Sequence, residues 1–260
     1  MSDDVVVRLR AAGCVFAEDE ARVLRSAAPD ADGLERLVRR RVAGEPLEVV
    51  VGFADFAGVR VRTAPGVFVP RTRTALMVQV ALGHLSGLDR PEPVVLDLCC
   101  GTGAVGVAVV AGTDRAVTLV ASDIDPAAVA CARLNVEPVG GRVLASDLFD
   151  AVPDDLRGRV EVLTCNAPYV PSEAVVGMPP EARDHEALVA LDGGHDGLDV
   201  VRRVLAEAPA WSRPGGIVVV EVAASQVERA SDAARRAGLD PVVRTDPGIG
   251  GRVLVSTLPV

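Results

Sequence analysis

The stretch Val94-Val-Leu-Asp-Leu-Cys-Cys-Gly-Thr-Gly-Ala-Val-Gly106 decides the fold. Its first five residues are mostly apolar and predict a strand, residues 99–103 predict a turn, and the residues after Gly103 begin a helix. A strand, a glycine-rich turn and a helix in this order are typical of α/β folds that hold nucleotide-like ligands at the ends of their strands. Gly101 and Gly103 would let the backbone approach such a ligand closely.

The alternation of predicted strands and helices continues toward the C-terminus. Short apolar segments alternate with helical ones, which is the signature of parallel β-α-β units. The expected strands are residues 94–98, 117–122, 142–145, 160–165 and 217–222, and the clearest helices are 126–135 and 198–210. The chain after Pro70 is therefore predicted to form an α/β domain.

The N-terminal part has a different pattern. Residues 5–43 have apolar positions three and four apart, which predicts two or three short helices. Residues 53–62 end in alternating apolar and charged side chains, as a half-exposed strand or hairpin would. We therefore expect a small helical domain over residues 1–48, a hairpin linker over 49–66 and the main domain over 67–260.

Composition indicates a folded protein and argues against two kinds of partner. Of the 260 residues, 49% are hydrophobic and 24% are charged, as in globular chains. The net charge of -9 disfavours stable nucleic-acid binding, and the one tight cationic cluster, Arg39 to Arg41, is expected to be a solvated helix face. No signal peptide is apparent, because the first residues, Met-Ser-Asp-Asp, lack a basic region followed by an apolar one. No membrane span is expected, because Glu221 interrupts the apolar run at 217–224.

The cysteines predict the compartment. The sequence has five, with no Cys-x-x-Cys pair among them, and they lie mostly in apolar segments. Reduced, buried thiols are the simplest interpretation. We therefore expect a cytoplasmic protein.

The glycine turn alone leaves two cofactors open. Gly101, Gly103 and Gly106 formally satisfy the G-x-G-x-x-G motif of dinucleotide-binding dehydrogenases, but the bare motif is a weak signal. Asp97, near the end of its strand, would repel a diphosphate and attract the ammonium group of the methionine moiety of S-adenosylmethionine. This carboxylate favours S-adenosylmethionine over NAD.

Two further carboxylates follow the next strands. Asp123 can accept both ribose hydroxyls, and Asp147 can accept a hydrogen bond from the adenine amino group. A lone aspartate in such a place is more often a helix cap or turn residue, as we expect for Asp125 before Pro126. Three carboxylates at successive strand ends indicate a binding site. The residues expected to contact the cofactor are Asp97, Gly101, Thr102, Gly103, Asp123, Asp147, Leu148 and Asn166.

The sharpest signal is the loop Asn166-Ala-Pro-Tyr169, which resembles the Asn-Pro-Pro-Tyr loop of nitrogen methyltransferases. An amide nitrogen is a poor nucleophile because its lone pair is delocalised. If the side-chain carbonyl of Asn166 and the main-chain carbonyl of Ala167 each accept one N–H, the lone pair can be turned toward the sulfonium methyl. Tyr169 would offer a flat face to the planar target. We expect Asn166 and Tyr169 to be catalytic, the substrate to contact Asn166, Ala167, Pro168 and Tyr169, and the reaction to need no metal.

Taken together, these segments resemble the HemK or PrmC family of protein N(5)-glutamine methyltransferases. Residues 40–47, 65–71, 185–199 and 248–254 also match stretches typical of that family, so the resemblance covers most of the chain. It implies a Rossmann-like class I methyltransferase fold, with a mostly parallel seven-stranded sheet and a small N-terminal helical domain. It also implies S-adenosylmethionine as the cofactor and a glutamine side-chain amide in a peptide chain release factor as the substrate.

The chain departs from the family pattern in four places. Ala167 replaces the first Pro of the loop, although the carbonyl needed there belongs to the main chain. Thr72-Arg-Thr-Ala75 replaces an acidic Pro-Glu-Thr-Glu segment, Ala187 replaces a Pro, and Cys99 occupies a usual Gly position.

Two other functions stay open at this point. An adenine amino group offers the same two N–H donors as a primary amide, so a nitrogen methyltransferase acting on RNA or DNA bases would use the same loop. The departures at Ala167 and at residues 72–75 also allow a cofactor-binding homologue that no longer transfers methyl groups. The acidic charge and the family-like segments outside the loop favour the protein substrate.

Overall fold

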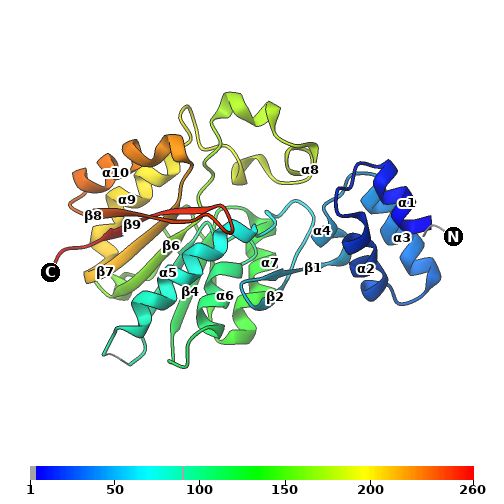
Figure 1. Ribbon diagram of the computed structural model, residues 1–260. Helices are drawn as coiled ribbons and strands as arrows, with labels where there is room; N and C mark the ends of the chain where they lie inside the picture. The colour runs from blue at the N-terminus through cyan, green and yellow to red at the C-terminus, as the bar shows by residue number, and fades with distance from the viewer. Residues whose placement is uncertain (1–3, 90) are drawn as a thin grey trace.

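A seven-stranded sheet forms the centre of the computed structural model, which describes residues 4–89 and 91–260 (Figure 1). The sheet order is β5-β4-β3-β6-β7-β9-β8, and β9 runs in the direction opposite to the other six strands. The strands are β3 (Val94–Leu98), β4 (Thr118–Asp123), β5 (Arg142–Ala145), β6 (Val160–Cys165), β7 (Ser212–Glu221), β8 (Asp240–Asp246) and β9 (Gly251–Thr257). The five expected strands are all present, and the predicted fold class is confirmed.

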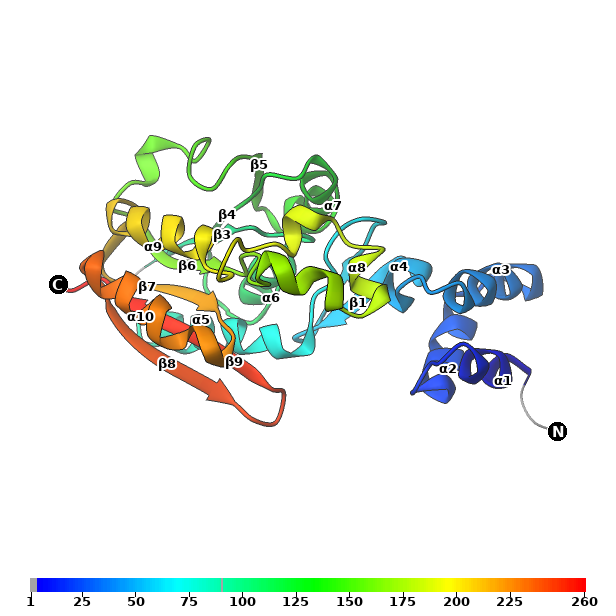
Figure 2. The ribbon, with the colours of Figure 1, turned by 90° about the horizontal axis from the view of Figure 1, so that it is seen from above.

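Helices cover both faces of this sheet (Figures 1 and 2). One face carries α5 (Ala75–Ser86), α6 (Ala104–Ala111) and α7 (Pro126–Val136), and the other carries α9 (Asp199–Trp211) and α10 (Val227–Arg236). Strand β3 is buried on both sides, so that Leu96 faces one core and Val95 the other. No helix in the described residues is long and apolar enough to cross a bilayer.

Short 3-10 turns connect several of these elements. They are Thr72–Thr74, Glu137–Val139, Asp154–Leu156, Ser172–Gly177, Leu188–Ala190 and Ala224–Gln226. The helix α8 (Pro180–Arg183) lies in the long connection between β6 and α9. This connection passes over the carboxyl ends of the strands and contributes side chains to the site.

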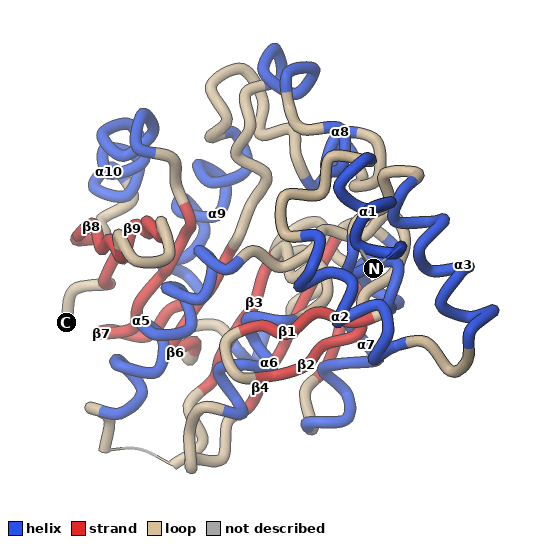
Figure 3. The backbone as a smooth tube through the Cα atoms, turned by 45° about the vertical axis from the view of Figure 1, so that its right-hand side comes forward, coloured by secondary structure: helices blue, strands red, loops and turns tan. Residues whose placement is uncertain are grey.

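The N-terminal helices form a lobe beside the sheet domain (Figures 1 and 2). They are α1 (Asp4–Ala11), α2 (Ala17–Ala27) and α3 (Ala31–Val42), which enclose a small core of their own around Leu9, Leu24 and Val38. The helix α4 (Leu47–Val51) and the hairpin of β1 (Phe53–Phe56) and β2 (Val59–Arg62) lead to the main domain, where the hairpin packs on α6 and α7 (Figure 3). The division at residues 48 and 66 stays a prediction, and α4 spans the first of these boundaries.

The expectation of a solvated basic face on α3 is wrong for Arg41. The side chain of Arg41 is only 10% exposed, and its Nε donates to Glu20 Oε2 at 2.6 Å. Arg41 also pairs with Glu181 of α8, whereas Arg39 and Arg40 pair with Glu35 and Glu45. Carboxylates therefore neutralise the cluster, and Arg41 links the N-terminal lobe to the connection that covers the site.

Candidate active site

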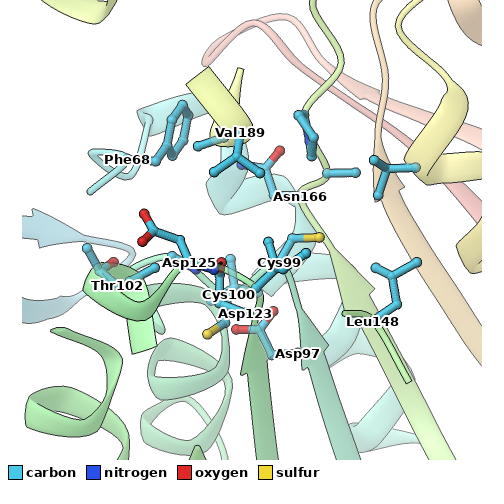
Figure 4. A pocket seen from close by; sticks show the side chains of 18 of the residues that line it. Phe68, Asp97, Cys99, Cys100, Thr102, Asp123, Asp125, Leu148, Asn166 and Val189 are labelled. Carbon is cyan, nitrogen blue, oxygen red and sulfur yellow. Dashed lines mark hydrogen bonds between the residues drawn. The ribbon is translucent and has the colours of Figure 1, made fainter. Parts of the chain in front are cut away.

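The turn between β3 and α6 lies at the base of a cavity at the carboxyl ends of the strands (Figure 4). Gly103 has a φ of 77° at the N-cap of α6, and a Cβ there would lie 2.5 Å from Val136 Cγ2, so both conformation and space require glycine. Cys99 has a φ of 52°, a left-handed conformation that glycine adopts more readily than cysteine. The carbonyl of Thr102 accepts a hydrogen bond from Asn135 Nδ2 at 2.9 Å, which fixes the turn against α7.

Asp97 is buried beside this turn. Its Oδ1 accepts a hydrogen bond from Thr164 Oγ1 at 2.8 Å, and its Oδ2 accepts one from the Gly106 amide at 3.1 Å. Burial raises the pKa of Asp97 to about 7, although both hydrogen bonds favour the charged form. The carboxyl therefore ties β3 to β6 and α6, and it changes charge near neutral pH.

Asp123 closes β4 at the edge of the same cavity. Its Oδ2 accepts from the Gly101 amide at 2.8 Å and its Oδ1 accepts from the Asp125 amide at 3.0 Å. Each carboxylate oxygen has further lone-pair sites, so Asp123 can also accept hydroxyl donors from a ligand. Burial raises the pKa of Asp123. Asp125 caps α7 through the Ala127 amide at 2.9 Å, as expected.

Asp147 and Leu148 follow β5 on the far side of the cavity. One oxygen of Asp147, Oδ2, is held by Arg203 Nη2 at 2.9 Å. The backbone of Leu148 has a φ of 49°, and its carbonyl accepts hydrogen bonds from the hydroxyls of Ser122 and Ser146. Leu148 is thereby fixed as an apolar wall.

Asn166 begins the loop after β6 and carries an unpaired polar atom. Its Oδ1 is buried, and no group of the described residues donates a hydrogen bond to it. A buried acceptor without a donor costs about 1 to 3 kcal/mol, so such an atom in a cavity wall calls for an explanation. A ligand N–H that enters the cavity would supply the missing donor.

Tyr169 ends this loop and is held through its hydroxyl. The guanidinium of Arg73 donates to the Tyr169 hydroxyl and lies 5.9 Å from the ring centroid. Arg73 Nε also donates to Glu221 Oε1 at 2.9 Å, and Thr74 Oγ1 donates to Glu221 Oε2 at 2.6 Å. Burial raises the pKa of the Tyr169 phenol. Arg73 therefore fixes the aromatic ring.

The cavity brings nearly all of the expected site residues together. The expected residues that line it are Asp97, Gly101, Thr102, Asp123, Asp147, Leu148, Asn166, Ala167, Pro168 and Tyr169. Gly103 is not among its lining residues and instead begins α6 behind the turn. Figure 4 shows Asp97 and Asp123 on one side of the cavity, and Asn166 on the other.

Several lining residues had not been expected. Phe68 and Val189 lie beside Asn166 in Figure 4, and Arg203 reaches the cavity from α9. Phe68 and Val189 belong to the family-like stretches 65–71 and 185–199, which was the only signal that pointed to them. Their loops meet the cavity through the tertiary fold, for which sequence periodicity gives no information.

Comparison with known proteins identifies the family. Residues 58–178 match the model of the methyltransferase small domain. The release factor glutamine methyltransferase of Streptomyces coelicolor is 38% identical over 201 residues, which are 76% of this chain and 71% of that protein. The chain belongs to the release factor glutamine methyltransferase family. The family member of Geobacter sulfurreducens is 34% identical over 84% of this chain and 76% of that protein. The resemblance drawn from the sequence is confirmed, and so is the class of enzyme.

One relative with another name shares the same region. The 4-amino-L-phenylalanine/4-methylamino-L-phenylalanine methyltransferase of Streptomyces pristinaespiralis is 36% identical over 71% of this chain and 63% of that protein. The release factor glutamine methyltransferase family therefore has a relative named for a small aromatic amine.

Solved structures agree on the fold. The ribosomal protein L11 methylase of Lactobacillus delbrueckii subsp. bulgaricus has a TM-score of 0.53 at 13% identity and covers 77% of this chain and 86% of its own. The T. thermophilus 16S rRNA N2 G1207 methyltransferase, in complex with AdoMet and guanosine, has a TM-score of 0.55 at 19% identity. The match covers 79% of this chain and 49% of that protein. These likenesses support the class I methyltransferase architecture.

Proposed function

We propose that this protein methylates the side-chain amide of a glutamine in a peptide chain release factor, with S-adenosylmethionine as the methyl donor. The observation that carries the proposal is the buried Asn166 Oδ1, which has no donor among the described residues and belongs to a residue that lines the cavity. A primary amide that enters the cavity would bring the missing N–H. Family membership supports both the cofactor and the substrate.

The cavity offers the groups that S-adenosylmethionine requires. Asp123, at the end of β4, has acceptor sites for the ribose hydroxyls, and the free oxygen sites of Asp147 suit the adenine amino group. Asp97 puts a carboxyl near the base of the cavity, where a negative charge would attract the cationic methionine end. Bound there, the cofactor supplies an electrophilic methyl group on a sulfonium.

The loop supplies orientation to the acceptor nitrogen. Asn166 Oδ1 and the Ala167 carbonyl are two acceptors, which equals the number of N–H donors on a primary amide. With both N–H groups held, the nitrogen lone pair is directed at the methyl group; the new N–C bond forms as the S–C bond breaks, and one amide proton then leaves to solvent. The ring of Tyr169, fixed by Arg73, would lie beside the planar amide.

Charge supports a protein substrate over a nucleic acid. Arg39, Arg40 and Arg41 each pair with a carboxylate, and the net charge of the chain is -9. A base would have to be delivered with its phosphates, which an acidic surface repels. The five cysteines are all free, which supports a reaction in the reducing cytoplasm.

The test is methyl transfer from labelled cofactor to four acceptors in parallel. They are a purified release factor, the same release factor with the loop glutamine changed to alanine, structured RNA, and 4-amino-L-phenylalanine. We expect label on the intact release factor alone, and none with the Asn166→Ala enzyme. Label on RNA or on the amino acid would replace the proposed substrate, and equal label on both release-factor forms would overturn the glutamine assignment. Label on no acceptor would support the alternative that the protein binds the cofactor but does not transfer methyl groups.

A further inference from the structure

Gln226 makes an unusual set of contacts behind the Asn166–Tyr169 loop. Its side chain is buried at the end of the 3-10 turn Ala224–Gln226, with 2% of the residue exposed. Its Nε2 donates to the carbonyls of Tyr169 at 2.8 Å, Asp196 at 3.2 Å and Gly197 at 3.2 Å. Its Oε1 accepts a hydrogen bond from the Ala223 amide at 3.0 Å. One side chain thus joins the end of β7 to two loops.

We infer that Gln226 is a positioning residue that sets the Asn166–Tyr169 loop for methyl transfer. The inference rests on the proposed role of that loop. Gln226 lines a second pocket, on which Tyr169 also borders, and it is not among the residues of the cofactor cavity. It therefore acts through Tyr169 and does not touch the reacting atoms.

The segment that Gln226 braces lies tightly against the loop. A Cβ added at Gly197 would lie 2.2 Å from the Tyr169 carbonyl oxygen, and one added at Gly193 would lie 2.5 Å from the Pro168 carbonyl oxygen. The Gly193 amide also donates to the Val170 carbonyl at 2.8 Å. This close approach explains why glycines stand at positions 193 and 197. The amide hydrogens of Gln226 then fix the position of the loop.

Tyr169 is consequently held at both ends. Arg73 holds its hydroxyl and Gln226 holds its carbonyl. The orientation of a neighbouring target amide depends on where this residue lies, and small misplacements of reacting groups slow a reaction strongly. Loss of the Gln226 donors should therefore lower kcat and leave the affinity for S-adenosylmethionine unchanged.

The first experiment compares Gln226→Glu with the wild type. The substitution keeps the shape of the side chain, but an ionised carboxylate cannot donate to the three carbonyls and would repel them. We expect kcat to fall about tenfold or more at roughly pH 8. Burial among three carbonyl oxygens should raise the pKa of the new carboxyl above that of a free glutamate, so the ratio of variant to wild-type kcat should recover toward about pH 6, as protonation restores one donor. Other titratable and charged groups around the same pocket are Glu173, His195, Asp196 and Arg229. Because the wild type also contains them, their effect on kcat cancels in the ratio of variant to wild type. Gln79→Glu, on the exposed side of α5, is the matched control and should behave as wild type.

A second measurement does not depend on activity. Tyr169 is the only tyrosine of the chain, so tyrosine labelled with ¹³C at its ζ carbon gives one NMR resonance that reports on the loop. Gln226→Glu and the uncharged Gln226→Met should shift or broaden this resonance, and Gln79→Glu should not. An unchanged resonance in either folded Gln226 variant, or a fall in kcat that lowering the pH does not relieve, would overturn the positioning role. If the wild type fails to methylate any release factor, the proposed function fails, and the resonance still decides the role of Gln226.

Discussion

The affinity for S-adenosylmethionine should rise as the pH is raised from about 5 to about 7. Burial holds the pKa of Asp97 at about 7, so this carboxyl is mostly neutral below neutral pH. A raised pKa means that the neutral form is favoured in the free protein, whereas a cationic ligand favours the charged form. Binding must therefore remove a proton from Asp97 at low pH, and this cost disappears once the pH passes the pKa.

The size of the effect follows from the fraction of Asp97 that is ionised. With a pKa of about 7, roughly 1% of the carboxyl is ionised at about pH 5 and half at about pH 7. If only the charged form bound the cofactor, the apparent dissociation constant would fall about fiftyfold over this range, because it scales inversely with the competent fraction. Residual binding by the neutral form reduces the change, so we expect the apparent dissociation constant to fall on the order of tenfold.

Isothermal titration calorimetry in two buffers with different ionisation enthalpies measures both the affinity and the protons released. The cofactor's own amino group stays protonated below about pH 7, so it does not contribute to the slope. Asp97→Asn should remove the pH dependence, and Asp240→Asn, on the exposed start of β8, should retain it. Burial also raises the pKa of Asp123, so a slope that survives in Asp97→Asn would assign the effect to Asp123 and refute the reasoning. A flat affinity in the wild type would refute it as well.

Four further outcomes test the rest of the site. Asp123→Ala should weaken cofactor binding about tenfold to a hundredfold in calorimetry, because it removes a charged acceptor that also holds the Gly101 amide; unchanged binding would argue against the ribose contact. Asn166→Ala should abolish turnover in single-turnover kinetics while cofactor affinity stays nearly intact, and a variant that keeps most of its kcat would disprove the orientation mechanism. Ala167→Pro should preserve or raise activity and stabilise the fold by about 0.4 to 1 kcal/mol in thermal unfolding, and a loss of stability would show that the loop does not accommodate the ring. Tyr169 should ionise at a higher pH than free tyrosine in an ultraviolet titration, since burial raises its pKa; a normal titration would mean that the ring is exposed.

The central strands could be predicted almost residue by residue. Strands β3, β5 and β6 have the expected bounds, because each is a short run of apolar residues between turn signals. Strands β8 and β9 had not been assigned. The segment Asp240–Asp246 contains a proline and alternates half-buried with exposed positions, as an edge strand does, and its pairing with β9 is antiparallel. Such a strand lacks the continuous apolar signal of a buried parallel strand.

Some residues of the site could also be predicted from the sequence, and others could not. Asp97, Asp123 and Asn166 follow parallel strands, and parallel strands end at one edge of a sheet, so their meeting could be expected before the fold was known. Phe68, Val189 and Gln226 lie on connections whose course depends on tertiary packing. Their positions in the sequence carry no periodic signal, and only the structure brings Phe68 and Val189 to the cavity and Gln226 to the back of the Asn166–Tyr169 loop.

The contacts of Arg73 weaken the case for a homologue without activity. Glu221 lies at the end of β7 with its side chain 4% exposed, and a buried carboxylate without a partner costs several kcal/mol. Arg73 and Thr74 provide that partner, and Arg73 also fixes the hydroxyl of Tyr169. Arg73 thus ties Tyr169 of the proposed catalytic loop to the end of β7, an arrangement that an unused site would not need. Because the carbonyl of Ala167 belongs to the main chain and Asn166 is present, the loop has both acceptor atoms that its proposed chemistry needs.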